Sequence, residues 1–139
     1  MSGPVEKHVN ITTQQIVKQN DQKDKFVHKT QGVWIKRKSE YIRYEEQIED
    51  TKVNVTIKFV DDGVKIIRKG DIHMTLHFVE GQDTMTYYHI PEGKMVLSVH
   101  TLSILHFVTD QGGKLKVHYE LYQGDEKMGI YQYEMNYQA

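Results

Sequence analysis

The chain has 139 residues, a length typical of one domain, so we take residues 1–139 as a single domain. Lysine and arginine total 18 and aspartate and glutamate total 19, and a net charge of -1 argues against a nucleic-acid groove, which needs a basic surplus. Cysteine is absent, which excludes disulfides, thiolate metal sites and a cysteine nucleophile. No apolar run approaches the ~18 residues of a membrane span, and the start of the chain has no signal-like segment. We therefore expect a cytoplasmic protein.

The residue types favour strands over helices. There are 14 valines, 12 isoleucines and 10 threonines, against 6 leucines and a single alanine. Branching at Cβ restricts the side chain in a helix but packs well on a pleated sheet. This composition predicts an all-β fold.

Three segments, 52–59, 71–78 and 114–121, alternate apolar and polar residues without error, which indicates strands with one buried face. Segment 94–109 changes phase between Val99 and Leu102, which predicts a bulge or bend at 100–103. Short turn signals rich in Gly, Asp and Pro separate the segments. The strands predicted in chain order are 8–18, 25–30, 33–38, 40–48, 52–60, 64–69, 71–79, 84–90, 94–109, 114–122 and 128–137.

Consecutive hairpins with one apolar face must close on themselves to bury that face and to remove the sheet edges. Because no long connection crosses from one strand to a distant one, the strands are expected to run up and down in chain order. We predict a closed antiparallel up-and-down β-barrel.

Several short motifs also occur in a recognisable order. They are Gly32-Val33-Trp34-Ile35, the segments 41–46, 66–70, 78–81 and 88–93, Thr101, and Val117-His118-Tyr119. This series resembles the uncharacterised bacterial calycin-like β-barrel family typified by YwiB. The resemblance covers nearly the whole chain and implies a lipocalin-like barrel. It implies no activity, ligand, cofactor or catalytic residue.

Arg68 is the residue most informative about a site. If Asp62-Gly63 form a two-residue hairpin loop, Ile57 faces Arg68, and Arg68 shares the buried face. A three-residue loop would instead turn two lysines of the same strand inward. A buried guanidinium needs a partner.

The preceding strand offers that partner, because Glu46 is the one charged residue on a face that also carries Tyr44. With a loop over 49–52, Tyr44 lies opposite Ile57, two strands from Arg68. Three interpretations remain open: an internal salt bridge with a tyrosine hydroxyl, a polar floor for a ligand, or an exposed Arg68.

The remaining motifs point to no catalytic chemistry. His73 and His77 would lie roughly 13 Å apart on one strand, too far to share a metal ion, so we interpret the histidines as surface residues. We find no nucleophile elbow and no phosphate-binding loop. We therefore expect no enzyme, metal or cofactor.

The favoured function is a non-enzymatic small-molecule-binding barrel with a partly polar interior. Its candidate ligand-binding residues are Tyr44, Glu46 and Arg68, and its candidate partner is a small anion, not nucleic acid or a membrane. The alternative is a structural or protein-interaction module with a filled core. The sequence predicts no oligomeric state.

Overall fold

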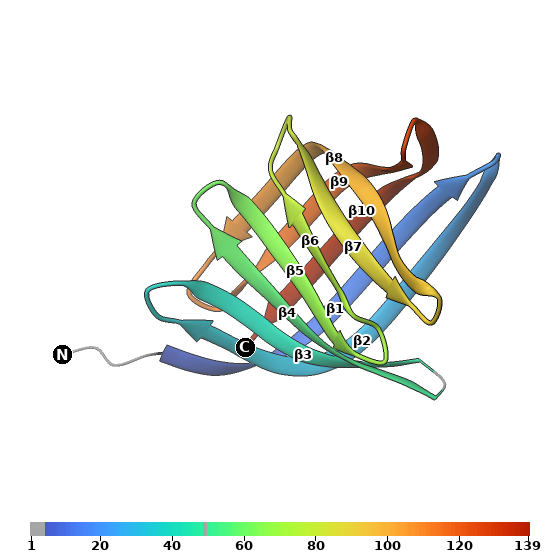
Figure 1. The fold of residues 1–139 in the computed structure, drawn as a ribbon. Helices are drawn as coiled ribbons and strands as arrows, with labels where there is room; N and C mark the ends of the chain where they lie inside the picture. Colours follow the sequence, from blue (N-terminus) through green and yellow to red (C-terminus); the bar gives the residue numbers. More distant parts are fainter. Residues whose placement is uncertain (1–4, 49) are drawn as a thin grey trace.

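The computed structural model describes residues 5–48 and 50–139, and it arranges them as ten strands of one antiparallel sheet (Figure 1). The strands are β1 (Val5–Gln19), β2 (Gln22–Lys36), β3 (Glu40–Ile48), β4 (Thr51–Val60), β5 (Gly63–Gly70), β6 (Met74–Phe78), β7 (Asp83–Ile90), β8 (Gly93–Val108), β9 (Gly112–Gln123) and β10 (Glu126–Gln138).

The strand order β6-β5-β4-β3-β2-β1-β10-β9-β8-β7 consists of consecutive hairpins plus one pairing of the first strand with the last. That pairing runs from Asn10 opposite Gln138 to Lys18 opposite Ile130. The sheet therefore curls into an up-and-down barrel, as the alternating strands and short turns predicted.

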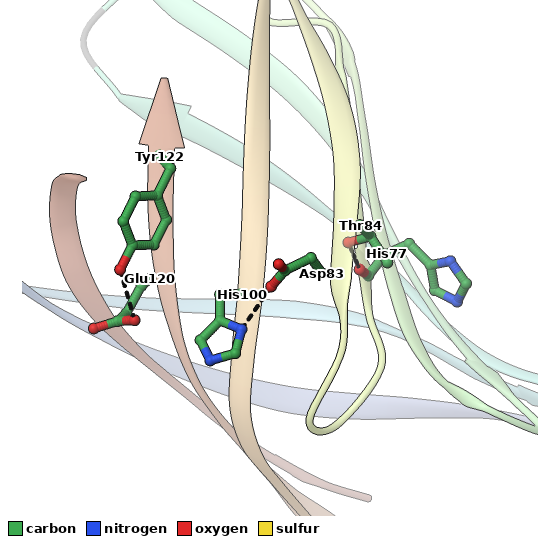
Figure 2. A network of polar contacts seen from close by, with 6 residues as sticks. All are labelled: His77, Asp83, Thr84, His100, Glu120 and Tyr122. Atoms are coloured by element: carbon green, nitrogen blue, oxygen red, sulfur yellow. Dashed lines mark hydrogen bonds and ion pairs between the residues drawn. The ribbon is translucent and has the colours of Figure 1, made fainter. Parts of the chain in front are cut away.

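The barrel is nearly closed at the seam between β6 and β7. The described residues form no backbone ladder there. Instead the hydroxyl of Thr84 donates to the carbonyl of His77 at 2.5 Å (Figure 2), and that of Thr86 donates to the carbonyl of Thr75. Threonine hydroxyls of β7 thus bond to backbone carbonyls of β6 that have no partner strand on that side among the described residues.

β2 corrects one prediction, because segments 25–30 and 33–38 form a single strand that ends at Lys36. The hairpin between β1 and β2 turns at Asn20 and Asp21, and both residues have positive φ. A two-residue turn requires this conformation to match the twist of the strands. Gly32 is not a turn residue. A Cβ there would lie 2.4 Å from the carbonyl oxygen of Arg43, so glycine allows β3 to approach.

Both predicted hairpin registers are wrong by two residues. The structure pairs Val60 with Gly63, which places Val55, not Ile57, opposite Arg68. It also pairs Ile48 with Thr51, which places Val55, not Ile57, opposite Tyr44. Because side chains alternate with a period of two, neither shift changes the face of any residue.

The bulge predicted in 94–109 is confirmed. Thr101 lies opposite Tyr119 and Ser103 opposite His118, so Leu102 is the extra residue. Before it, Val99 and Thr101 are buried, and after it Ile104 and His106 take the inner face. The predicted strand 71–79 is shorter than expected, because β6 covers Met74–Phe78 only.

Apolar side chains fill much of the interior, and aromatic rings close one end of it. Trp34 packs edge-on against Tyr137 with 5.1 Å between ring centroids, and Phe59 stacks on His106 at 4.0 Å. The indole N–H of Trp34 donates to Glu40 at 2.9 Å. These contacts leave the polar interior residues toward the opposite end.

Candidate functional site

A cavity opens where β2 and β3 separate. Their pairing stops at Gly32 opposite Tyr44, and beyond that point Gln22–Gln31 of β2 pair with β1 alone. In Figure 1 the β1–β2 hairpin projects beyond the other strands. The cavity has a volume of about 580 Å³ and is lined by Thr13, Gln15, Lys25, Phe26, Val27, His28, Tyr44, Glu46, Arg68 and Tyr133.

The structure brings all three residues singled out in the sequence into this cavity. Tyr44 and Arg68 flank Val55 on adjacent strands, and Glu46 lies opposite Val53, two positions along the same face. The Nε of Arg68 is 3.9 Å from Oε2 of Glu46, and the two side chains are 16% and 19% exposed. This distance is near the upper limit for an ion pair and is too long for a hydrogen bond.

The surroundings of Arg68 keep it charged. Burial acts to lower its pKa, but the neighbouring Glu46 carboxylate and the hydroxyls of nearby tyrosines outweigh that effect, and the pKa lies above its ordinary value. The cavity therefore contains a permanent cation whose counter-ion, Glu46, is close but not hydrogen-bonded to Nε.

Two tyrosines form a neutral hydrogen-bonding pair beside this ion pair. The hydroxyl oxygens of Tyr44 and Tyr133 are 3.0 Å apart in a buried contact. Burial raises the pKa of Tyr44 to about 12 and raises that of Tyr133 well above its ordinary value. Near neutral pH both hydroxyls are protonated and act as donor and acceptor.

Two buried polar atoms in the cavity have no hydrogen-bond partner among the described residues. They are Oε2 of Glu46 and Nε2 of His28. Buried polar atoms are normally hydrogen-bonded, because a lone one keeps its desolvation cost uncompensated. Both residues line the cavity, so a bound molecule could supply the missing partners once their side chains turn toward it.

Sequence reasoning missed the β1, β2 and β10 contributions to this cavity. Thr13 lies opposite both His28 and Met135, so the inner face of β1 continues across both neighbouring strands. The alternation Val9, Ile11, Thr13 extended across the hairpin to Thr30, His28 and Phe26 would have found the wall formed by β2. Tyr133 is the residue that β10 contributes to the cavity.

The mouth of the cavity is apolar and basic. Phe26 and Val27 are 59% and 56% exposed, although both are large and apolar. Lys25 lies beside them. No cluster of three or more possible metal ligands occurs in the described part of the chain. The arrangement offers charge and hydrogen bonds to a molecule.

A second polar cluster lies on the outer side of β7, β8 and β9 (Figure 2). Nδ1 of His100 is 2.6 Å from Asp83, and Tyr122 donates to Glu120 at 3.2 Å. Lys127 pairs with the same Glu120 at 2.6 Å, and hydrogen bonding to Lys127 lowers the Glu120 pKa. The charged groups of this cluster are paired with one another, which favours a solvated surface network.

Comparison with known proteins identifies relatives along nearly the full chain. Residues 9–135 match the family model described as Domain of unknown function (DUF1934). A relative, the uncharacterized beta-barrel protein YwiB of Bacillus subtilis (strain 168), is 22% identical over 132 residues, which cover 94% of this chain and 93% of that protein.

The crystal structure of the ywiB protein from Bacillus subtilis superposes with a TM-score of 0.86 at 21% identity, and the match covers 96% of this chain and 92% of that one. At this identity the likeness shows the fold. The family resemblance and the barrel predicted from the sequence are thereby confirmed. In the described residues, no helix is long and apolar enough to cross a bilayer.

Proposed function

Because the chain belongs to the family described as Domain of unknown function (DUF1934), a description that gives no activity, we propose a function from its own cavity. The protein is a non-enzymatic β-barrel that binds a small anionic molecule through Tyr44, Glu46 and Arg68. The observation that carries this proposal is the cavity of about 580 Å³ whose wall includes all three residues.

The charges around the cavity favour an anion. Arg68 and Lys25 supply two positive charges, and Glu46 supplies one negative charge. Arg68 retains hydrogen-bonding capacity, because a guanidinium has five N–H donors and its Nε lies 3.9 Å from Glu46. A carboxylate or phosphate is the natural partner for such a group.

The polar groups of the cavity are better suited to binding than to catalysis. The hydroxyl of Thr13 donates to the backbone carbonyl of His28 at 3.5 Å, so it is not directed at the imidazole that would have to activate it. Tyr44, with a pKa of about 12, holds its proton too firmly to act as a base near neutral pH.

Thermal shift with a panel of small anions tests the proposal. Wild-type protein should melt higher in the presence of phosphate, sulfate or short carboxylates, with a rise proportional to the logarithm of concentration. Arg68→Met should lose that rise. Arg43→Met is the matched control, because Arg43 is exposed on β3, and it should keep the rise. An equal rise in Arg68→Met, or none with any anion, would contradict the proposal.

One observation favours the second function, a protein-interaction module. Gln22–Gln31 of β2 have a strand on one side only, and this edge carries the exposed Phe26 and Val27. Free edges are templates for strand addition. Light scattering of wild type and of a Phe26→Ser, Val27→Ser variant distinguishes the two, because self-association lost in the variant would favour this function.

The proposal keeps the cytoplasmic location expected from the sequence. Fractionation of native cells with an antibody against the protein tests this location, and recovery with the membrane or secreted fraction would contradict it.

A further inference from the structure

The two unpartnered atoms of the cavity restrict what can bind there. Oε2 of Glu46 is an acceptor, and it lies 3.9 Å from Nε of Arg68, which is a donor. A ligand that is only an anion satisfies Arg68 but places its own negative oxygens against the Glu46 carboxylate. A ligand that is only a cation satisfies Glu46 but places its positive charge against the Arg68 guanidinium. A molecule that carries both an acceptor and a donor satisfies both residues.

The spacing restricts how those two groups are connected. Because the protein atoms are 3.9 Å apart, the ligand atoms that meet them must also be close neighbours. An ammonium or hydroxyl group on the carbon next to a carboxylate has this geometry. Nε2 of His28, a residue that also lines the cavity, is a second buried polar atom without a partner in the described part of the chain.

The mouth of the cavity adds an apolar requirement. Phe26 lies on the inner face of β2, opposite Gln15, and is more than half exposed at the edge of a cavity whose inner wall is polar. An apolar chain lying over this ring would remove its surface from water, which stabilises the complex. The ligand is therefore expected to have a polar head and a short apolar tail.

Resting on the proposed binding function, we propose that the cavity takes a small α-substituted carboxylate, an amino acid or hydroxy acid with an apolar side chain. The carboxylate lies against Arg68, the α-ammonium or α-hydroxyl donates to Oε2 of Glu46, and the side chain lies over Phe26.

Four probes related to leucine test this class by thermal shift. Leucine carries both groups, leucic acid replaces the ammonium by a hydroxyl, isocaproic acid keeps only the carboxylate, and isoamylamine, which lacks the carboxyl carbon, keeps only the amine. We expect leucine or leucic acid to raise the melting temperature at concentrations at least about tenfold lower than isocaproic acid or isoamylamine. The factor reflects the loss of a hydrogen bond to a charged group.

Two variants assign this preference to Glu46. In Glu46→Gln the advantage of leucine or leucic acid over isocaproic acid should fall several-fold, because the carboxylate acceptor is gone. Glu45→Gln is the matched control on the outer face of the same strand and should keep the full advantage. Each variant is compared with its own unliganded melting temperature, so a loss of stability does not hide the result. Arg68→Lys retains the charge and should still bind the probes.

The outcomes separate the two proposals. If isocaproic acid binds as well as leucine and leucic acid, and Glu46→Gln changes nothing, the ligand class is wrong while anion binding at Arg68 stands. If none of the four probes binds but phosphate or sulfate does, the ligand class is again wrong and anion binding at Arg68 again stands. If no probe or anion binds, both proposals are wrong.

Discussion

At the scale of single side chains, the ion pair of Glu46 and Arg68 lies between a buried and a surface pair. Removing one partner of a fully buried pair typically costs ~3–5 kcal/mol, because the other charge is left alone. These side chains are 16% and 19% exposed, so water screens part of that cost. We expect Glu46→Gln and Arg68→Met each to lower the free energy of unfolding by about 1–3 kcal/mol in urea titrations, and the double variant to lose less than their sum.

A neighbouring pair provides the control for this cycle. Glu45 on β3 and Lys52 on the neighbouring β4 are 3.5 Å apart but 49% and 63% exposed. Surface pairs of this kind contribute under about 1 kcal/mol, and their variants should show little coupling. Additive losses at Glu46 and Arg68, like those expected for the exposed pair, would show that the two charges do not interact.

The tyrosine pair links stability to high pH. An unfolded tyrosine ionises near pH 10, whereas the pKa of Tyr44 in the folded protein is about 12. A raised folded pKa stabilises the protein below the unfolded value, and this contribution is lost as pH rises from about 10 to about 12.

Tyr44→Phe should therefore flatten the decline in the free energy of unfolding across that range, by up to about 1.4 kcal/mol per pH unit. Urea titrations at several pH values measure the slope. An unchanged slope in Tyr44→Phe would mean that Tyr44 does not keep its proton through burial.

At the scale of strands, the sequence predicted that Tyr44 and Arg68 face each other across β4 because two errors of register cancelled. Both hairpins are shifted by two residues, and each shift replaces Ile57 by Val55 as the residue between Tyr44 and Arg68. The relation of Tyr44 to Arg68 across β4 is therefore the one predicted. Period-two alternation predicts the face of a side chain well, whereas the turn that fixes register depends on local geometry.

The cavity itself could not be predicted from alternation. It exists because β2 stops pairing with β3 at Gly32 while β2 continues to pair with β1 as far as Gln22. Where two strands separate depends on strand twist and on the length of the hairpin, neither of which a residue pattern records. The same limit explains why segments 25–30 and 33–38 were predicted as two strands although they form one.

The bulge in β8 gives a prediction at this scale. Deleting Leu102 would restore regular pairing and keep Ile104 and His106 on the inner face, opposite the same residues of β9. Their contacts with the core would be kept, including the stacking of His106 on Phe59. We expect little change in melting temperature for the deletion, and equally little for Leu102→Ser, because this side chain is exposed. A large fall in melting temperature for the deletion alone would show that the extra residue is needed for packing.

At the scale of the whole molecule, closure depends on β10, which pairs with β1 on one side and β9 on the other. Met135 lies in the middle of this junction, opposite Thr13 and Leu115. Its side chain is fully buried, whereas that of Met85 on β7 is 63% exposed. Replacing Met135 by alanine leaves a cavity, and we expect a loss of about 2–5 kcal/mol, against little change for Met85→Ala as the matched control.

The kinetics of the same variant report when the barrel closes. Contacts between β1 and β10 join residues more than a hundred positions apart, so their chain-entropy cost favours late formation. If closure follows the transition state, Met135→Ala should speed unfolding and leave the folding rate nearly unchanged in stopped-flow measurements. A slower folding rate with unchanged unfolding would instead place the pairing of the first and last strands in the folding nucleus. In that case the hairpins would assemble around a closed ring, and closure would not be the step that completes the barrel.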